Sequence, residues 1–256
     1  MAGIAAIQSS MPRLHKLQAA DSVLPSTHLH TSYALCWTLL ALFSGSTLLL
    51  NSVSGPTVNL VAVTKSARQK LKPTYVIADA RSIPRFLEEM TTTAGNSGIG
   101  GKYSAWSTGR AINQGYMEVE NSPTYLPVGL SGLKTLYIAQ PDILEGAQRV
   151  KSSTLSALRL LLGARVSLAL TTGRVAGYVA QTNVLDYRDK GDACCVGPVA
   201  ASLELHLTGA EEEMSKVDGV GALTVKGPAV TGKDKDKVVL DHIRVRVDSD
   251  NTLVLM

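Results

Sequence analysis

The segment Gly95–Lys102 is the place where residue types and spacing come nearest to a chemical motif, because four glycines precede a lysine. Such a loop can wrap backbone N–H groups around a phosphate when a strand precedes it and a Lys-Ser/Thr pair follows. Here the spacing to the Gly-Lys pair is wrong, Tyr103 replaces the hydroxyl that would bind magnesium, and no strand pattern precedes the glycines. We therefore interpret the segment as a flexible loop.

Nucleophilic and metal-binding chemistry has no motif either. The three cysteines are Cys36, Cys194 and Cys195. No Cys-x-x-Cys pair suggests zinc or thiol exchange, and adjacent cysteines close a disulfide only in a strained ring. Serine, histidine and aspartate all occur, but no Gly-x-Ser-x-Gly elbow frames a nucleophile. The sequence thus predicts idle thiols, no metal site and no hydrolase chemistry.

The charge pattern argues against a nucleic-acid partner. The net charge is +4, and only 18% of the residues are charged. Basic residues are scattered except near Lys65–Lys72 and Lys226–Lys237, and the alternating lysines and aspartates of Lys233–Lys237 are typical of a solvated turn. With two Phe and two Trp to stack on bases, no nucleic-acid binding is predicted.

No Asp, Glu, Lys or Arg occurs between Asp21 and Lys65, and the run Tyr33–Val53 is apolar enough to be considered as a membrane span. A Ser-Gly-Ser-Thr break after Phe43 interrupts it, and the helix-like part before the break rises only about 16 Å, roughly half of a bilayer core. A buried helix-to-strand step explains the pattern, with membrane insertion or attachment as the alternative. The predicted location is intracellular, either cytoplasmic or membrane-associated.

The elements that carry these residues alternate between helices and short strands. We predict helices at 32–43, 57–70, 81–93 and 152–162, and strands at 46–50, 74–78, 134–138 and 165–170. This alternation implies right-handed crossovers and a parallel sheet. Further strands are predicted at 202–207, 221–226, 238–247 and 252–256. The predicted fold class is α/β, a largely parallel sheet with flanking helices followed by a smaller β-rich subdomain.

Three regions follow from this pattern: an N-terminal arm at 1–27, an α/β region at 28–190 and the β-rich subdomain at 191–256. Within the second region, residues 91–132 hold eight glycines and few apolar runs, which is typical of a long flexible insertion. The arm is basic and has no acid in its first 20 residues, so a mitochondrial presequence is an alternative interpretation.

Motifs near the end of the chain keep the order of a known enzyme family. Val196-Gly197-Pro198 is followed by an alternating strand at 202–207, a polar turn, and a segment at 221–228 that reads GALTVKGP. This order resembles the late adenylation domain of the ATP-dependent adenylate-forming (AMP-binding, acyl-CoA synthetase-like) superfamily. The family pattern there is V-G-x-P, a strand with E-x-K, and G-E-[IL]-x-V-x-G-P. The chain resembles a partial, degenerate adenylation domain.

Earlier segments resemble the same family in the same order. His28-Leu29-His30-Thr31-Ser32 opens the apolar run as the family's P-x-x-H segment does, and residues 72–78 and 133–138 are similar to its next strands. The likeness therefore runs from about His28 to about Met256.

The resemblance implies positions for substrate and nucleotide. In the family a histidine at this helix start lines the acyl pocket, so His28 or His30 is expected to bind substrate; a histidine satisfied by backbone at a helix N-terminus is the alternative. Thr171 or Thr172 matches the threonine of the family's Tyr-Gly-x-Thr-Glu motif and is expected to bind nucleotide. ATP and Mg would be the cofactors if the chain is active, and an acyl or other small molecule its ligand.

Several groups that the family needs are missing from their expected positions. Adenylate formation requires phosphate clamps, one carboxylate for magnesium, another for ribose and a mobile lysine. Gly173 stands where the magnesium-binding Glu is expected, Ala222 replaces the Glu of the last motif, and Ala139–Asp142 replaces the Gly-Gly-Ala-Pro turn that admits adenine. The Thr-Gly-Asp motif is missing, with Asp241 or Asp248 as alternative ribose ligands.

We therefore predict an incomplete acyl-CoA synthetase-like protein, without catalytic residues of its own and unable to form an acyl-adenylate alone. Whether it is an enzyme stays open; if active, it would be an ATP-dependent acid-thiol ligase. One alternative is a fragment of a longer acyl-CoA ligase that activates a carboxylic (fatty) acid with ATP. The other is a membrane-associated interaction protein anchored by Tyr33–Val53.

Overall fold

A computed structural model describes most of the chain. The described residues are 1–12, 16–50, 72–95, 130, 132–143, 149–188, 190–208, 220–231 and 237–256. The predicted helix 57–70 and most of the glycine-rich segment lie outside the described residues.

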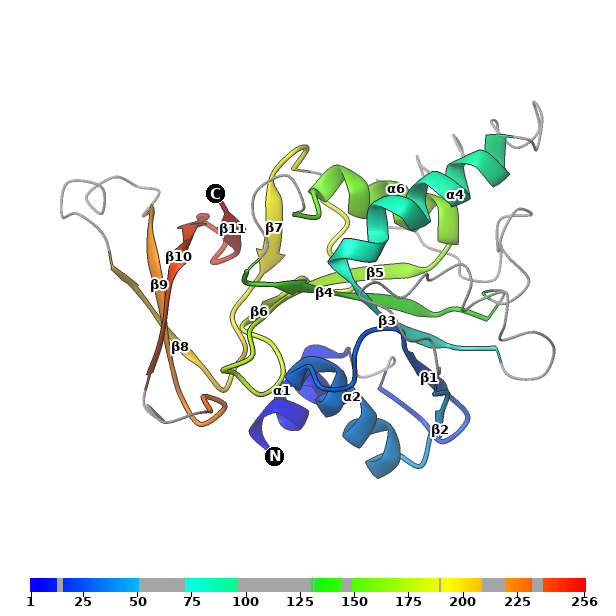
Figure 1. Cartoon of the computed structure of the whole chain (residues 1–256), viewed down its shortest axis with the longest axis horizontal. Helices are drawn as coiled ribbons and strands as arrows, with labels where there is room; N and C mark the ends of the chain where they lie inside the picture. The colour runs from blue at the N-terminus through cyan, green and yellow to red at the C-terminus, as the bar shows by residue number, and fades with distance from the viewer. Residues whose placement is uncertain are drawn as a thin grey trace.

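A six-stranded sheet forms the larger part of the molecule, in the order β2-β1-β3-β4-β5-β6 (Figure 1). Its strands are β1 (Ser22–Pro25), β2 (Thr47–Leu48), β3 (Tyr75–Asp79), β4 (Thr135–Pro141), β5 (Arg165–Thr171) and β6 (Ala180–Gln181). The first five strands run parallel, and β6 is antiparallel to β5. The central strands β3, β4 and β5 are buried along nearly their whole length, as expected for a parallel sheet covered on both faces.

Helices cover both faces of this sheet. The helices are α1 (Ala2–Ser10), α2 (Ser32–Phe43), the short 3-10 helix η2 (Ala80–Ser82), α4 (Ile83–Gly95) and α6 (Ser152–Leu162). In Figure 1, α1 and α2 lie below the sheet, and α4 and α6 lie side by side above it. The side chain of Thr31 caps α2, and Gly163 ends α6 in the left-handed conformation with φ 55°.

A second, five-stranded sheet is antiparallel and has the order β7-β11-β10-β9-β8. Its strands are β7 (Cys194–Gly197), β8 (Glu204–Thr208), β9 (Val220–Lys226), β10 (Lys237–Val247) and β11 (Leu253–Leu255). The burial of β8 and β10 alternates between inward and outward residues, which is how a sheet with one solvated face behaves. The predicted α/β fold class with a smaller β-rich part is confirmed.

Individual predictions differ from the structure mainly at the N-terminus. Helix α1 and strand β1 were not predicted in residues 1–27, and neither were the short strands β6 and β7. Helix α4 continues to Gly95, so the first residues of the segment predicted as a loop at 91–132 are helical. The division into three regions stays a prediction.

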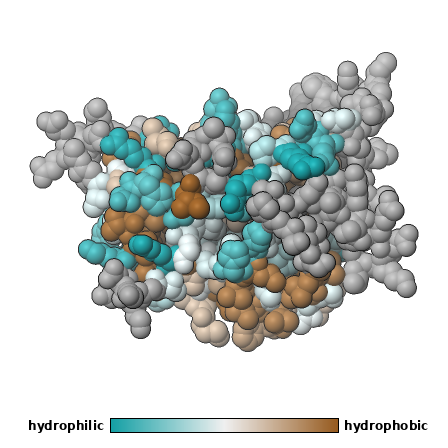
Figure 2. All heavy atoms as spheres, in the orientation of Figure 1, coloured by the Kyte–Doolittle hydropathy of each residue, from teal (hydrophilic) through white to brown (hydrophobic). Residues whose placement is uncertain are grey.

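The apolar run at 33–53 is a twelve-residue helix, a turn and the two-residue strand β2 in its described part. Among the described residues, no helix has the length and apolar character needed to cross a bilayer. One side of α2 packs inward through Tyr33, Trp37 and Ala41, while Leu42 and Phe43 are 61% and 69% exposed. Figure 2 shows apolar atoms gathered on the lower edge of the molecule, where Figure 1 has α2.

Candidate functional site

The carboxyl ends of the parallel strands form the candidate site. They point toward the antiparallel sheet in Figure 1, and polar residues lie at or just after the ends of β1, β3, β4 and β5. In open parallel sheets this edge is the usual place for ligands, because the loops and helix N-termini that leave the strands converge there. The polar residues at this edge are Ser26, Thr27, His28 and His30 after β1, Asp79 at the end of β3, Asp142 after β4, and Thr171 and Thr172 at the end of β5.

The two histidines lie in the loop between β1 and α2. Their rings stack on each other with centroids 5.1 Å apart. His30 is exposed and His28 is half-buried. The backbone carbonyl of His28 accepts a hydrogen bond from the Thr31 hydroxyl at 2.9 Å, and the Thr31 side chain caps the helix. The histidines are thus held at the N-terminus of α2.

The end of β5 meets this histidine loop although the two segments are far apart in sequence. The Ser32 hydroxyl donates to the carbonyl oxygen of Thr172 at 3.1 Å, which joins the start of α2 to the loop after β5. The Thr172 hydroxyl accepts from the N–H of Arg174 at 3.4 Å, and both Thr171 and Thr172 are buried. The residues predicted to contact substrate and nucleotide therefore share one edge of the sheet.

Gly173 stands at the position where the resemblance expects a magnesium-binding carboxylate. A Cβ atom built there would have nothing within 4 Å beyond its own chain neighbours, so the backbone leaves room for a side chain that this sequence lacks. Among the residues that the structure describes, no group of three or more His, Cys, Asp or Glu side chains converges to hold a metal ion.

Two carboxylates lie at the edge, and each has a partner. Arg81 donates to both oxygens of Asp79, at 3.0 and 2.7 Å, and this ion pair raises the pKa of the Arg81 guanidinium. Asp142 lies 3.7 Å from the imidazole of His242 on β10, between Oδ2 and Nε2, and so links the edge of the parallel sheet to the antiparallel one. A bidentate guanidinium satisfies a carboxylate, so Asp79 is unsuited to bind magnesium.

The end of β4 carries a buried amide side chain. Gln140 is 0% exposed, and its Oε1 accepts a hydrogen bond from the N–H of Val150 at 3.0 Å. The strand β4 continues through Pro141, which pairs with Thr171. Where the resemblance expects two glycines that leave the backbone open to a base, this chain has a buried amide that ties down the following connection.

Comparison with solved structures identifies the fold of the chain. No family model matches the chain, and no curated protein matches it. A benzoate CoA ligase from Burkholderia xenovorans LB400 superposes with a TM-score of 0.64 at 13% identity, over 99% of this chain and 45% of that protein. The chain has the fold of the adenylate-forming ligases.

Two further solved structures share this adenylating fold. Coronafacic Acid Ligase from Pectobacterium brasiliense gives a TM-score of 0.63 at 12% identity, over 99% of this chain and 42% of that protein. The artificially fused adenylation-PCP di-domain NpsA-ThdA from Klebsiella oxytoca gives 0.63 at 13% identity, over 100% of this chain and 43% of that protein. The chain thus spans less than half of the length of each of these three structures.

Below the sheet of this adenylating fold, aromatic side chains pack against one another. The ring of Trp37 lies 4.5 Å from that of Tyr137 and 6.3 Å from that of Tyr75, and Tyr33 packs edge-on against both Trp37 and Tyr178. Burial raises the pKa of Tyr75 to about 12 and raises the pKa values of Tyr33 and Tyr137 strongly. This face of the sheet is filled by side chains.

Helix α1 closes the same face. The Tyr178 hydroxyl donates to the carbonyl of Ala6 at 3.1 Å. At Gly3 the helix lies so close to the loop after β5 that an added Cβ would be 2.5 Å from the carbonyl oxygen of Ala176. Only glycine permits this approach, so α1 is fixed beside the loop that carries Thr172 and Gly173.

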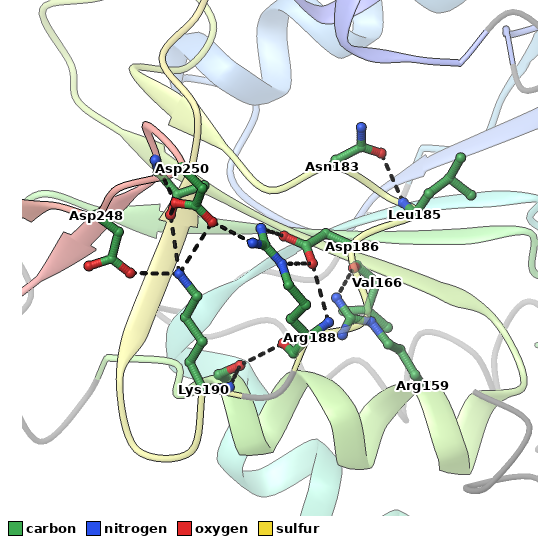
Figure 3. Close-up of polar contacts among 11 residues, drawn as sticks. Arg159, Val166, Asn183, Leu185, Asp186, Arg188, Lys190, Asp248 and Asp250 are labelled. Carbon is green, nitrogen blue, oxygen red and sulfur yellow. Dashed lines mark hydrogen bonds and ion pairs between the residues drawn. The ribbon is translucent and has the colours of Figure 1, made fainter. Parts of the chain in front are cut away.

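A network of charges fastens the two sheets together (Figure 3). Arg188, in the connection after β6, binds Asp186 at 2.7 Å and also Asp250, and Arg188 lowers the pKa of Asp186. Lys190 binds Asp248 at 2.6 Å, and this contact lowers the pKa of Asp248. Because Asp248 and Asp250 belong to the turn between β10 and β11, we call these five residues the clasp.

Asp248, one of the two predicted ribose ligands, belongs to the clasp. Asp248 is held by Lys190 and by Arg246, at 2.6 and 3.0 Å, and Asp241 lies 3.5 Å from its neighbour His242 on β10. The roles of His28, His30, Thr171 and Thr172 as ligands stay predictions.

Sequence reasoning missed three contributors to the edge. These are the contact of the buried Gln140 amide with Val150, the link made by the Ser32 hydroxyl, and the Asp142–His242 pair. The position of Asp142 could have been predicted, because an acidic residue that directly follows a buried parallel strand lies at the carboxyl edge of the sheet. The contacts of Ser32 and His242 have no local signal, because their partners are distant in sequence.

Proposed function

We propose that this chain is an acyl-CoA synthetase-like scaffold that binds a small acyl ligand at the carboxyl edge and does not form an acyl-adenylate by itself. The adenylating fold supports a ligand site at the carboxyl edge. The residues of this edge support the proposal that the chain does not form an acyl-adenylate. The observation that carries the proposal is the pair of departures at Gly173 and Gln140. Gly173 leaves out the carboxylate that would bind magnesium, and Gln140 puts a buried amide, bonded to Val150, where the family pattern has a glycine.

ATP and magnesium are the groups that the fold implies, and the described residues do not fit them. Asp79 is neutralised by Arg81, and Asp142 is a single carboxylate beside an imidazole. Magnesium bound to nucleotide is usually held by one or two free carboxylates together with phosphate oxygens. We therefore derive no chemical step through either group.

An uncharged or weakly charged ligand suits the edge better. The edge offers the hydroxyl groups of Thr171 and Thr172 and the imidazole groups of His28 and His30 as hydrogen-bonding partners. The half-buried ring of His28 stacks on that of His30, and the nearby Ser32 hydroxyl is bonded to the carbonyl oxygen of Thr172. An acyl group with one polar end is the ligand class that these side chains favour.

The test is ATP–pyrophosphate exchange with a panel of fatty and aromatic acids. We expect no exchange above background for the purified chain, with or without added Mg. The variant Gly173→Glu places a carboxylate at an open position and should fold normally, but should not give exchange while Gln140 replaces the glycine of the family pattern. Robust exchange by the unmodified chain would refute the proposal.

A second candidate function is favoured by one observation, the exposed apolar side of α2 at Leu35, Leu39, Leu42 and Phe43. A contiguous apolar surface on a helix usually marks a contact with another polypeptide. Together with the partial span of the matched structures, this favours a piece of a longer acyl-CoA ligase that activates a carboxylic acid with ATP. Sequencing the transcript for a continuous upstream frame that encodes a Ser/Thr-Gly-rich loop is the direct test.

A further inference from the structure

The outer side of α2 carries four large apolar side chains that are between 37% and 69% exposed. We call them the α2 stripe: Leu35, Leu39, Leu42 and Phe43. The opposite side of the helix is buried and also apolar, so α2 is apolar on both of its sides. A helix of this kind is normally covered all round. We therefore expect a further surface to cover the α2 stripe.

The spacing of the α2 stripe fits a second helix. Leu35, Leu39 and Leu42 follow one another by four and then three residues, which is the d–a–d spacing of a coiled-coil seam. Side chains with this spacing form one narrow row that packs into the gaps between the side chains of a facing helix. Helix α2 lies at the lower edge of the molecule in Figure 1, and Figure 2 shows apolar atoms gathered there. The stripe is thus placed where another molecule can reach it.

The lack of charge around the α2 stripe favours a second copy of this chain as the partner. A twofold interface brings the same surface of both copies together, so that surface must be compatible with itself. No Asp, Glu, Lys or Arg occurs between Asp21 and Lys65, and two stripes can therefore meet without opposing like charges. Helices that lie on lipid surfaces, by contrast, are rich in lysine and arginine on their polar face. Helix α2 has neither residue.

The ends of α2 favour an antiparallel pair. The helix has no acidic residue in its first turn and no basic residue in its last turn, so no side-chain charge offsets its macrodipole. An antiparallel second copy places the positive N-terminus of one helix beside the negative C-terminus of the other. With the twofold axis near Leu39, the two Leu39 side chains meet. Leu35 of one copy then lies beside Leu42 and Phe43 of the other.

The exposed area indicates a weak pair. The four side chains together expose about as much surface as two complete side chains, or roughly 300 to 400 Å² in each copy. A stable specific interface buries about 800 Å² of each partner, so the α2 stripe suits a transient contact with a dissociation constant on the order of 10 to 100 μM. At much lower concentrations the chain is a monomer, and the pairing then adds nothing to its folding stability.

We propose that two copies of this chain associate through the α2 stripe as an antiparallel, twofold-symmetric dimer. The proposal does not depend on the acyl ligand at the carboxyl edge. It is an alternative to the second candidate function, in which another part of a longer polypeptide would cover the same stripe.

Sedimentation velocity of the whole purified chain, from about 1 to about 300 μM, tests the proposal. We expect the average sedimentation coefficient to rise with concentration from the value of a monomer toward that of a dimer and no further. Leu35→Lys would bury an unpaired ammonium in the pair and should weaken the association about tenfold or more. Leu185→Lys is the matched control, because Leu185 follows β6 and is 47% exposed, as Leu35 is. This control should leave the association unchanged.

Opposite charges at Leu39 test the twofold arrangement. Leu39→Glu and Leu39→Lys should each associate more weakly than the unmodified chain, because like charges meet across the axis. An equimolar mixture should associate more strongly than either variant alone, since each charge then faces its opposite. Far-UV circular dichroism checks that each variant is folded.

Three results would overturn the proposed dimer. The first is a chain that stays monomeric at every concentration, and the second is an association that Leu35→Lys leaves unchanged. The third is flotation of the monomer with phosphatidylcholine vesicles that Leu35→Lys abolishes, which would assign the α2 stripe to a lipid surface. None of them affects the exchange assay that tests the proposed function.

Discussion

The two faces of the parallel sheet are packed in different ways. Below the sheet, α1 and α2 enclose aromatic rings that contact one another, and Trp37, Tyr33 and Tyr137 are almost completely buried. Above it, α4 and α6 leave a hollow with charged residues on its rim. The same strands thus support an aromatic layer on one side and a hollow between two helices on the other.

This difference bears on where ligands can enter. On the lower face the rings of Tyr33 and Trp37 pack edge-on, with centroids 6.4 Å apart, directly after the start of α2. On the upper face a hollow of about 510 Å³ lies between α4 and the start of α6, and its lining residues Ile83 and Val150 are themselves buried. The comparison can be tested by substitutions that disturb one face and spare the other.

The largest effect is expected from Trp37→Ala, which removes the central ring of the lower face. Its indole contacts Tyr33, Tyr75 and Tyr137, so the substitution leaves a cavity and should lower the free energy of unfolding by about 3 to 5 kcal/mol. Urea denaturation followed by far-UV circular dichroism measures this loss. A decrease below about 1 kcal/mol would mean that the aromatic layer does not support the fold.

The second-largest loss of stability is expected at the contact between α1 and the loop after β5. A side chain at Gly3 would meet backbone atoms of Ala176, so Gly3→Val should destabilise the protein by about 1 to 3 kcal/mol. Gly173→Ala is the matched control, because its Cβ meets nothing within 4 Å. Equal effects of both substitutions in thermal unfolding would show that α1 is not fastened there.

Alkaline pH should weaken the lower face selectively. Burial raises the pKa of Tyr75 to about 12 and raises that of Tyr137 further, so these phenols stay neutral in the folded protein at a pH where the unfolded chain loses their protons. Their contribution is complete below about pH 10, the ordinary value for tyrosine, and is lost as the pH rises through the folded pKa values.

Tyr137→Phe isolates this effect. The variant should lose less stability than the unmodified chain when the pH is raised from 9 to 11, and the two should differ little in slope between pH 6 and 8. Chemical denaturation at each pH measures the slopes. Parallel slopes up to pH 11 would contradict the burial of this phenol.

Much of the architecture was predictable because its signals are local. The predicted helix at 32–43 has the observed bounds, since Thr31 is a good cap and a Ser-Gly pair follows Phe43. Strand β1 was not predicted, because a four-residue segment that ends in proline is too short to show the periodicity of a strand. Helix α1 was missed because nine residues without a side-chain cap gain their stability from the distant contact at Gly3.

The candidate site also contains residues that the sequence predicted and contacts that it did not. Thr171, Thr172, His28 and His30 were predicted from a resemblance in order, and the structure brings their loops together through Ser32. The hydrogen bond between Gln140 and Val150 depends on how one side chain is oriented, and the Asp142–His242 contact depends on how two sheets meet. Neither can be read from spacing along the chain.

The smallest effect is expected on the outer side of α2. Leu42 is exposed, and its side chain takes no part in the buried layer that Trp37 organises on the inner side of the same helix. Leu42→Lys should therefore change the free energy of unfolding by no more than about 0.5 kcal/mol. Urea denaturation of the purified variant gives the value, and Leu40→Lys, at a buried position two residues away, should destabilise strongly. If Leu42→Lys proved as damaging as Leu40→Lys, the outer side of α2 would be core, and the contrast between the filled and open faces would have to be redrawn.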